Sequence, residues 1–246
     1  MSSYLEKIGR IRAHLALEGA AGAVLSTPDN VFYATGFSSV MDGWHLVEPI
    51  AAVFVPTDAA SPVILILPEA SVISPIVSER GGHPVYFDRL ATFDMLNFCE
   101  TARAEDAHLA LPDDLLAELG DVMEQVEGQC EPDIIQTIAA SLSRHVAKGE
   151  RVLFDDLRVA ARVKALTGQA SGDALDVMFA ARAVKTANEI DTLRESGQIA
   201  DAIMAYTISQ LGVGKSWSEV EKQVAHFMID HDVDPLPGSP MLFGGA

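Results

Sequence analysis

The chain has few cysteines. Cys99 and Cys130 are the only two, which is too few for a disulfide scaffold, and their spacing matches no zinc-binding pattern. We therefore interpret both as reduced thiols that take no part in holding the fold together.

Long apolar runs are also missing. No stretch reaches the roughly 18 consecutive apolar residues that begin to indicate a transmembrane helix. The segment from Met1 to Lys7 lacks the basic region and apolar core of a signal peptide. These two absences predict a cytoplasmic protein without a membrane partner.

Basic residues are outnumbered by acidic ones. Lysine and arginine total 17 against 35 aspartates and glutamates, which gives a net charge of −18. Between Glu100 and Asp133 there are eleven acidic residues and one lysine or arginine, Arg103. Such a surface repels phosphates, which argues against nucleic acid as a partner. It would keep the protein in solution or attract a basic partner.

The sequence does contain an alternation of strands and helices. Short apolar runs predict strands at residues 23–26, 50–55, 63–67, 85–87 and 151–154. Periodic apolar residues and capping signals predict helices at 5–17, 31–35 (capped by Asn30 and closed by Gly36), 69–80, 132–148 and 156–166 (capped by Asp156). This order predicts an α/β domain with a mixed sheet flanked by helices.

A second unit is expected toward the end of the chain. A helix over residues 188–211 carries a stripe of apolar residues. Ser216-Trp-Ser-Glu219 has the pattern of a capping box that begins another helix, with Val220, Val224 and Phe227 on its buried face. We therefore predict two domains, residues 1–172 and residues 173–246.

Three segments, in this order and spacing, resemble the creatinase, prolidase and Xaa-Pro aminopeptidase family. They are a helix with Arg10 and Arg12 that leads through a strand to Pro28-x-Asn30-x-x-Tyr33-x-x-Gly36, then Arg182-x-x-Lys185-x-x-x-Glu189-Ile190, and then Gly212-x-Gly214 before the capping box. The resemblance implies a creatinase-like N-terminal domain followed by the first two helices of an incomplete pita-bread catalytic domain. Alone, Tyr33 and Gly36 fit a helix end packed on a sheet, and Lys185 and Glu189 fit a surface pair.

The resemblance also implies a metal-dependent hydrolase. Members of the family hold two divalent ions with two aspartates, one histidine and two glutamates, and the ions activate a shared water. That oxygen-rich set suits Mn²⁺, Co²⁺ or Zn²⁺. The resemblance places these ligands in a region that would begin near Met241. We therefore expect this chain to hold no metal and no catalytic residue and to be an inactive fragment, whereas a full-length parent would bind two ions and form a homodimer.

The loop that contains Trp44 and His45 is the candidate for substrate contact. In dimers of the family, the N-terminal domain reaches the mouth of the partner's active site. An aromatic ring and a titratable imidazole are suited to gripping a small organic substrate. A single tryptophan beside a strand also suits a core. His226 and Asp230, four residues apart, are interpreted as a polar helix end.

The leading hypothesis is therefore a fragment of a hydrolase that cleaves a peptide bond or a related C–N bond in a small peptide. Members of the creatinase, ectoine hydrolase and dimethylsulfoniopropionate lyase types act on other small organic molecules, so the substrate stays open. The alternative is a metal-free binding or dimerisation module, for which the acidic surface would suit a basic partner.

Overall fold

The computed structural model of the chain describes residues 2–39, 41–42, 48–95 and 112–233. The chain divides into two compact units, Met1–Val184 and Lys185–Ala246. None of the helices in the described ranges has the length and apolar character needed to cross a membrane.

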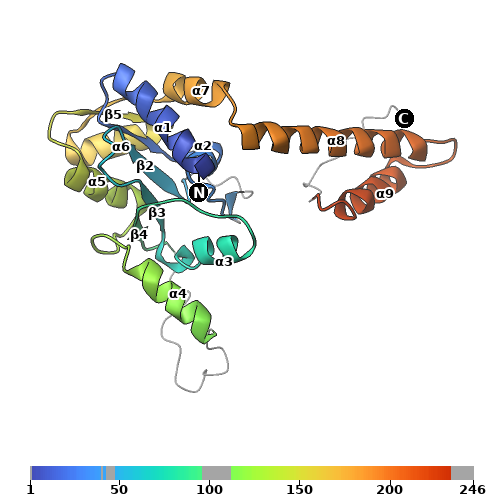
Figure 1. Cartoon of the computed structure of the whole chain (residues 1–246), viewed down its shortest axis with the longest axis horizontal. Helices are drawn as coiled ribbons and strands as arrows, with labels where there is room; N and C mark the ends of the chain where they lie inside the picture. The colour runs from blue at the N-terminus through green and yellow to red at the C-terminus, as the bar shows by residue number, and fades with distance from the viewer. Residues whose placement is uncertain (1, 40, 43–47, 96–111, 234–246) are drawn as a thin grey trace. The chain divides into compact units, whose positions relative to one another are not determined.

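The first unit contains a six-stranded sheet and the helices that cover it (Figure 1). The strands are β1 (Gly22–Leu25), β2 (Ala52–Pro56), β3 (Ile64–Pro68), β4 (Arg89–Phe93), β5 (Arg151–Phe154) and β6 (Ala170–Asp173). The helices are α1 (Ser2–Leu17), α2 (Pro28–Thr35), α3 (Ser74–Arg80), α4 (Asp113–Met123), α5 (Ile134–His145), α6 (Leu157–Thr167) and α7 (Leu175–Ala183), with a short 3-10 turn at Glu69–Ser71.

The strand order across the sheet is β4-β3-β2-β1-β5-β6. Strand β2 is antiparallel to both of its neighbours, β1 and β3, whereas β1, β5 and β6 pair in parallel, as do β3 and β4. The strands other than β2 therefore run in one direction, and their carboxyl ends meet at one edge of the sheet. In α/β proteins, that edge is where ligands bind. The mixed sheet predicted from the sequence is confirmed.

Two hydrophobic cores lie on opposite faces of the sheet. One face is covered by α1, α2 and α7, which bury side chains such as Ile11, Val31 and Met178. The other is covered by α5 and α6, which bury Ile138 and Val163. Alternate residues of each central strand enter alternate cores, and burying each such side chain contributes about 1.5–3 kcal/mol. This layered packing holds the carboxyl edge of the sheet in place.

The strand predicted at residues 85–87 is wrong. The backbone N–H of Tyr86 donates to the carbonyl oxygen of Thr35, at the end of α2, so this segment runs beside α2 and not along a strand. The strand lies a few residues later, in β4, where Leu90 and Phe93 are buried. Three consecutive apolar residues therefore did not suffice to predict a strand, because the backbone of this segment bonds α2 and not a neighbouring strand.

The structure also departs from the predicted start of α2. Asn30 does not cap a helix, because the helix already begins at Pro28 with Thr27 before it. The predicted closure is confirmed, since Gly36 has a left-handed φ of 79° and its N–H donates to the carbonyl oxygen of Phe32. The predicted Asp156 cap of α6 is also confirmed.

The division between the two units falls between Val184 and Lys185, later than the boundary predicted at residues 172 and 173. Two contacts keep the intervening segment with the first unit. Strand β6 pairs with β5 along its length, and α7 packs against α1. Arg10 of α1 also donates a hydrogen bond to the carbonyl oxygen of Val184.

The second unit contains two packed helices, α8 (Ala187–Gln210) and α9 (Trp217–Ile229). Each begins with a capping box, Thr186 with Glu189 in α8 and the predicted Ser216 with Glu219 in α9. Their small core contains Val220, Val224 and Met228 of α9. The rings of Tyr206 and Phe227 stack across the pair, with centroids 4.2 Å apart.

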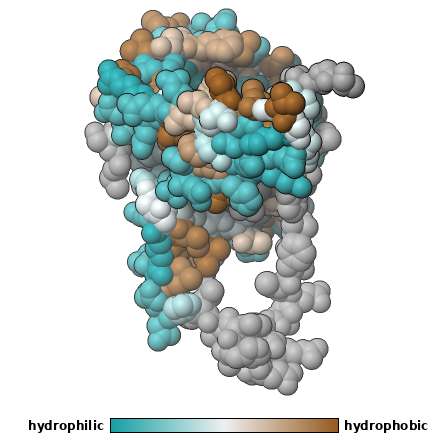
Figure 2. All heavy atoms as spheres, turned by 90° about the vertical axis from the view of Figure 1, so that its right-hand side faces the viewer, coloured by the Kyte–Doolittle hydropathy of each residue, from teal (hydrophilic) through white to brown (hydrophobic). Residues whose placement is uncertain are grey.

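Helix α4 is amphipathic and only partly covered. It has no fully buried residue, and Leu116 and Met123 are each 46% exposed. Figure 2 shows apolar side chains gathered on one side of the lower part of the view, where α4 extends, and polar ones on the other side. Its acidic side is tied to α3, because Arg80 pairs with Asp114 and Glu118 at 2.7 Å and 2.8 Å.

Replacing Gly36 by alanine should destabilise the first unit strongly. A Cβ atom there would collide with the Tyr4 side chain and approach the carbonyl oxygen of Pro84 to 2.8 Å. Gly168, at the end of α6, is the matched control, because its φ is 69° but nothing lies within 4 Å of its added Cβ. We expect Gly168→Ala to cost about 1 kcal/mol from backbone strain alone and Gly36→Ala roughly 3 kcal/mol or more. Equal midpoints in urea unfolding would contradict this explanation.

The exposed apolar stripe of α8 should bind hydrophobic dyes. It consists of Ile190, Leu193, Met204, Ile208 and Leu211, which are between 38% and 62% exposed. Replacing Leu193 and Ile208 by glutamine should lower the fluorescence of anilinonaphthalene sulfonate with little change in helix content, because glutamine forms helices well. As the contrast, Val224→Gln in the core should raise dye binding and loosen the second unit. Unchanged fluorescence in the double variant would show that the stripe is not accessible.

Candidate functional site

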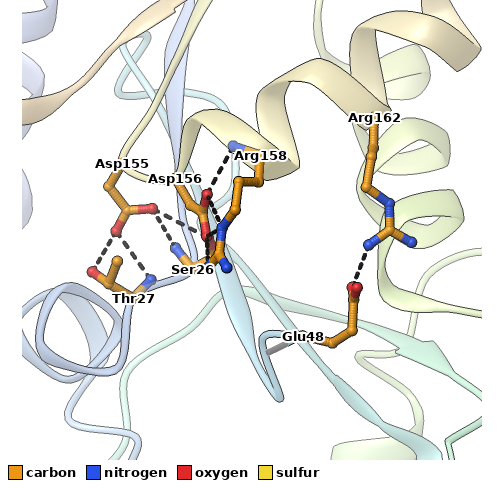
Figure 3. Close-up of polar contacts among 7 residues, drawn as sticks. All are labelled: Ser26, Thr27, Glu48, Asp155, Asp156, Arg158 and Arg162. Atoms are coloured by element: carbon orange, nitrogen blue, oxygen red, sulfur yellow. Dashed lines mark hydrogen bonds and ion pairs between the residues drawn. The ribbon is translucent and has the colours of Figure 1, made fainter. Parts of the chain in front are cut away.

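Asp155 lies at the carboxyl edge of the sheet, directly after β5, and accepts five hydrogen bonds from the segment that follows β1, four from the loop and one from the first turn of α2. Two come from backbone N–H groups, those of Ser26 at 2.8 Å and Thr27 at 3.1 Å. Two come from the hydroxyls of the same residues, at 3.2 Å and 2.6 Å (Figure 3). The fifth comes from the side-chain amide of Asn30, at 3.0 Å. One carboxylate therefore joins the ends of two parallel strands and sits at the start of α2, where negative charge is favourable.

Asn30 extends this network to the end of α7. Its side-chain oxygen accepts a hydrogen bond from Arg182 at 3.0 Å. The hydroxyl of Tyr33 donates to the carbonyl oxygen of Ala181 at 2.9 Å, and the Arg182 guanidinium lies 5.8 Å from the centre of the Tyr33 ring. The first two segments that carried the family resemblance thus contact each other within the first unit.

Asp156 occupies the start of the neighbouring helix, α6. Its carboxylate accepts a hydrogen bond from the backbone N–H of Arg158 at 2.8 Å. The Arg158 side chain folds back onto the same carboxylate, with an N–O distance of 2.7 Å (Figure 3). The hydrogen bond from the Arg158 side chain is the main cause that lowers the pKa of Asp156, and the backbone bond adds to it. The carboxylate is therefore ionised at neutral pH.

A cavity of about 280 Å³ opens at this edge, between the starts of α2 and α6. Three carboxylates line it, those of Asp42, Glu48 and Asp156, together with one guanidinium, that of Arg158. Glu48 forms an ion pair with Arg162 of α6 (Figure 3). The rest of the lining is mostly apolar, and it includes Val31, Phe37 and Ile50.

Asp42 differs from the other two carboxylates of the cavity. Burial raises the pKa of Asp42, and a hydrogen bond from the backbone N–H of Ser39, at 2.8 Å, opposes the rise. Within the described part of the chain, no lysine or arginine forms an ion pair with it. A carboxylate that is partly desolvated and not neutralised gains most from a cation placed beside it.

The structure places neither of the two site residues predicted from the sequence. Trp44 and His45 lie outside the described residues, and of the same loop only Met41 and Asp42 are described, both lining the cavity. Among the described residues, no group of three or more histidine, cysteine, aspartate or glutamate side chains could hold a metal ion. The ligand set that the resemblance implies therefore finds no match in this part of the chain.

Two structural features were not recognised from the sequence. Asp155 had no assigned function, although Ser26 and Thr27 offer a cluster of donors directly after β1. The capping box of Thr186 and Glu189 was also missed, although its spacing equals that of Ser216 and Glu219. The spacing could have revealed the second feature, whereas the first requires knowing that β1 and β5 are neighbours.

Replacing Asp155 by asparagine should lower the free energy of unfolding by about 2–4 kcal/mol. An amide presents one donor group where the carboxylate accepted only, so at least one N–H of the loop would face another donor. Asp156→Asn is the matched control, since it removes the same charge one residue away and asparagine caps helices equally well, for a cost of at most about 1 kcal/mol. Urea unfolding followed by circular dichroism measures both variants, and equal losses would refute a special contribution of Asp155.

Comparison with known proteins gives a match in structure only. No protein-family model matches the sequence, and no curated protein does. Among solved structures, the chain is similar to a prolidase from Thermococcus sibiricus, with 16% identity, a TM-score of 0.57, and coverage of 93% of this chain and 50% of that one. Dipeptidase PepE from Mycobacterium ulcerans gives 18% identity, a TM-score of 0.57, and the same two coverages, 93% and 50%.

An Xaa-Pro dipeptidase from Bacillus anthracis gives 16% identity and a TM-score of 0.56, over 93% of this chain and 49% of that one. The chain thus spans about half the length of the dipeptidases that it matches. At such identities the likeness establishes the fold alone. The expected fold, a mixed sheet flanked by helices as in the N-terminal domain of this family, is therefore confirmed.

Proposed function

We propose that the chain forms part of a metal-dependent hydrolase that acts on Xaa-Pro dipeptides or similar small peptides. The observation that carries the proposal is the structural match to prolidases and Xaa-Pro dipeptidases over 93% of the chain. A match over this share of the chain extends beyond the first unit, which ends at Val184. The three spaced segments of the sequence give independent support.

In this proposal the chain supplies the accessory part of the enzyme. The first unit is the N-terminal domain, and α8 with α9 leads into the catalytic domain. We assign the metal ligands to the portion of the prolidases that this chain does not span, and the described residues show no metal-binding cluster. Two Mn²⁺, Co²⁺ or Zn²⁺ ions would activate the attacking water in a full-length homodimer. The chain alone is then inactive.

The alternative is a metal-free module that binds a basic partner. The acidic segment up to Asp133 favours it, but the structure weakens that argument. Arg80 of α3 pairs with Asp114 and Glu118 of α4 and lowers the pKa of both. Arg80 therefore neutralises part of the acidic charge within the chain, so less negative charge is available to attract a basic partner.

Hydrolysis of Ala-Pro in the presence of MnCl₂ tests the proposal. The chain alone should release no proline above the blank and should retain no manganese after desalting, because its described residues offer no ligand set. A full-length enzyme that contains this chain should retain two ions per protomer and accelerate the cleavage of Ala-Pro by a factor of about 10⁶ or more over the blank. Pro-Ala, the reversed dipeptide, is the substrate control and should not be cleaved.

The two measurements separate the hypotheses. Cleavage of Ala-Pro by this chain alone would overturn the assignment of the catalytic residues to the remainder of the enzyme. A full-length protein that retains no metal and cleaves neither dipeptide would overturn the hydrolase proposal and favour the binding module. Two bound ions without cleavage of either dipeptide would point to a different substrate and contradict the dipeptidase.

A further inference from the structure

We propose that the cavity at the carboxyl edge of the sheet binds a small organic cation, namely a primary amine or ammonium group that carries a short apolar chain. The cavity belongs to the first unit and is independent of the dipeptide chemistry proposed above. Its position between the ends of β1 and β5, at the starts of two helices, is the place where α/β folds bind ligands.

The starts of α2 and α6 would ordinarily favour an anion, but backbone donors beside both of them are already used. The backbone N–H groups of Ser26 and Thr27 donate to Asp155, and the N–H of Arg158 donates to Asp156. The carboxylate of Asp156 therefore occupies the position that an anionic ligand would take at the N-terminus of α6, and that of Asp155 uses the N–H groups of the two residues that precede α2. An anion would find these donors used and two negative charges beside them.

The charges that line the cavity favour a cation. Three carboxylates face one guanidinium, and the guanidinium of Arg158 is already bound to Asp156. Glu48 is paired with Arg162, which leaves Asp42 as the carboxylate without an ion-pair partner among the described residues. An ammonium group beside Asp42 would form a charge-assisted hydrogen bond, and its charge would offset the desolvation that raises the pKa of this carboxyl.

The apolar part of the lining defines the remainder of the ligand. Val31 and Phe37 are 2% and 3% exposed, and Ile50 is 6% exposed, so these side chains are held firmly by the core behind them. A short alkyl chain placed against them would leave water for an apolar wall, so the gain would come from burying the alkyl chain itself. A volume of about 280 Å³ lies at the small end of ligand pockets, and it suits a molecule of a few carbon atoms.

Titration of the isotope-labelled chain with n-butylammonium chloride, followed by two-dimensional ¹H–¹⁵N NMR, tests the proposal. Amide signals of Ile50 and Ala51 should shift and saturate with a Kd on the order of 1 mM, as expected for a ligand of so few atoms. Butyrate and 1-butanol, at equal ionic strength, should produce no saturable shift at these residues. They separate the contribution of the positive charge from that of the alkyl chain.

Asp42→Asn should weaken n-butylammonium binding by about tenfold, since asparagine keeps the acceptor for the Ser39 N–H but loses the charge. Asp29→Asn is the matched control, because Asp29 is exposed in the first turn of α2 and is not part of the cavity lining. It should leave the Kd within about twofold. If Asp42→Asn fails to fold, Glu48→Gln serves instead, with a weakening of about threefold because Arg162 already offsets that charge.

Three outcomes would overturn the inference. Shifts that do not saturate, or that spread over the surface, would mean that the ammonium ion only screens the negative chain. Saturable binding of butyrate would show that the cavity accepts an anion. Equal weakening in Asp42→Asn and Asp29→Asn would show that net charge, and not the cavity, attracts the probe. None of these results bears on dipeptide hydrolysis, so the two proposals fail separately.

Discussion

The carboxylate of Asp155 is the point on which the arrangement of the first unit depends. It gathers donors from Ser26, Thr27 and Asn30, more than 120 residues earlier in the chain. Through Asn30 the same network reaches Arg182 at the end of α7. Burying part of a carboxylate costs free energy unless it accepts hydrogen bonds. Burying the N–H and hydroxyl donors of the loop costs free energy unless they have an acceptor. Each side satisfies the other, so the ends of β1 and β5, α2 and α7 are fixed together.

Several residues of the first segment that predicted the fold have structural roles in or near this network. Asn30 bonds Asp155 and Arg182, Tyr33 reaches Ala181, and Gly36 adopts a left-handed conformation against Tyr4. Each of these contacts joins parts of the first unit that are separated in the sequence, so each helps to hold its fold.

Local sequence signals predicted most of the helices and strands. Features that depend on contacts between distant segments were missed. The caps formed by Asp156 and by Ser216 with Glu219 depend on residues within one turn, so they were readable. Strand β6, with the sequence Ala-Ser-Gly-Asp, has no apolar pattern and exists because β5 offers it an edge. The role of Asp155 depends in the same way on the pairing of β1 with β5. No spacing along the sequence encodes which strands become neighbours.

The same constraint changes what the carboxyl edge can bind. An α/β sheet usually leaves the amides of its helix starts free for phosphate or carboxylate ligands, but here Asp155 and Asp156 take those positions as structural groups. The site that remains is bounded by Asp42, Glu48 and apolar side chains. Holding the helices with carboxylates therefore converts an edge suited to anions into one suited to cations. In a chain with a net charge of −18, this is the sign of ligand that long-range electrostatics would also bring to it.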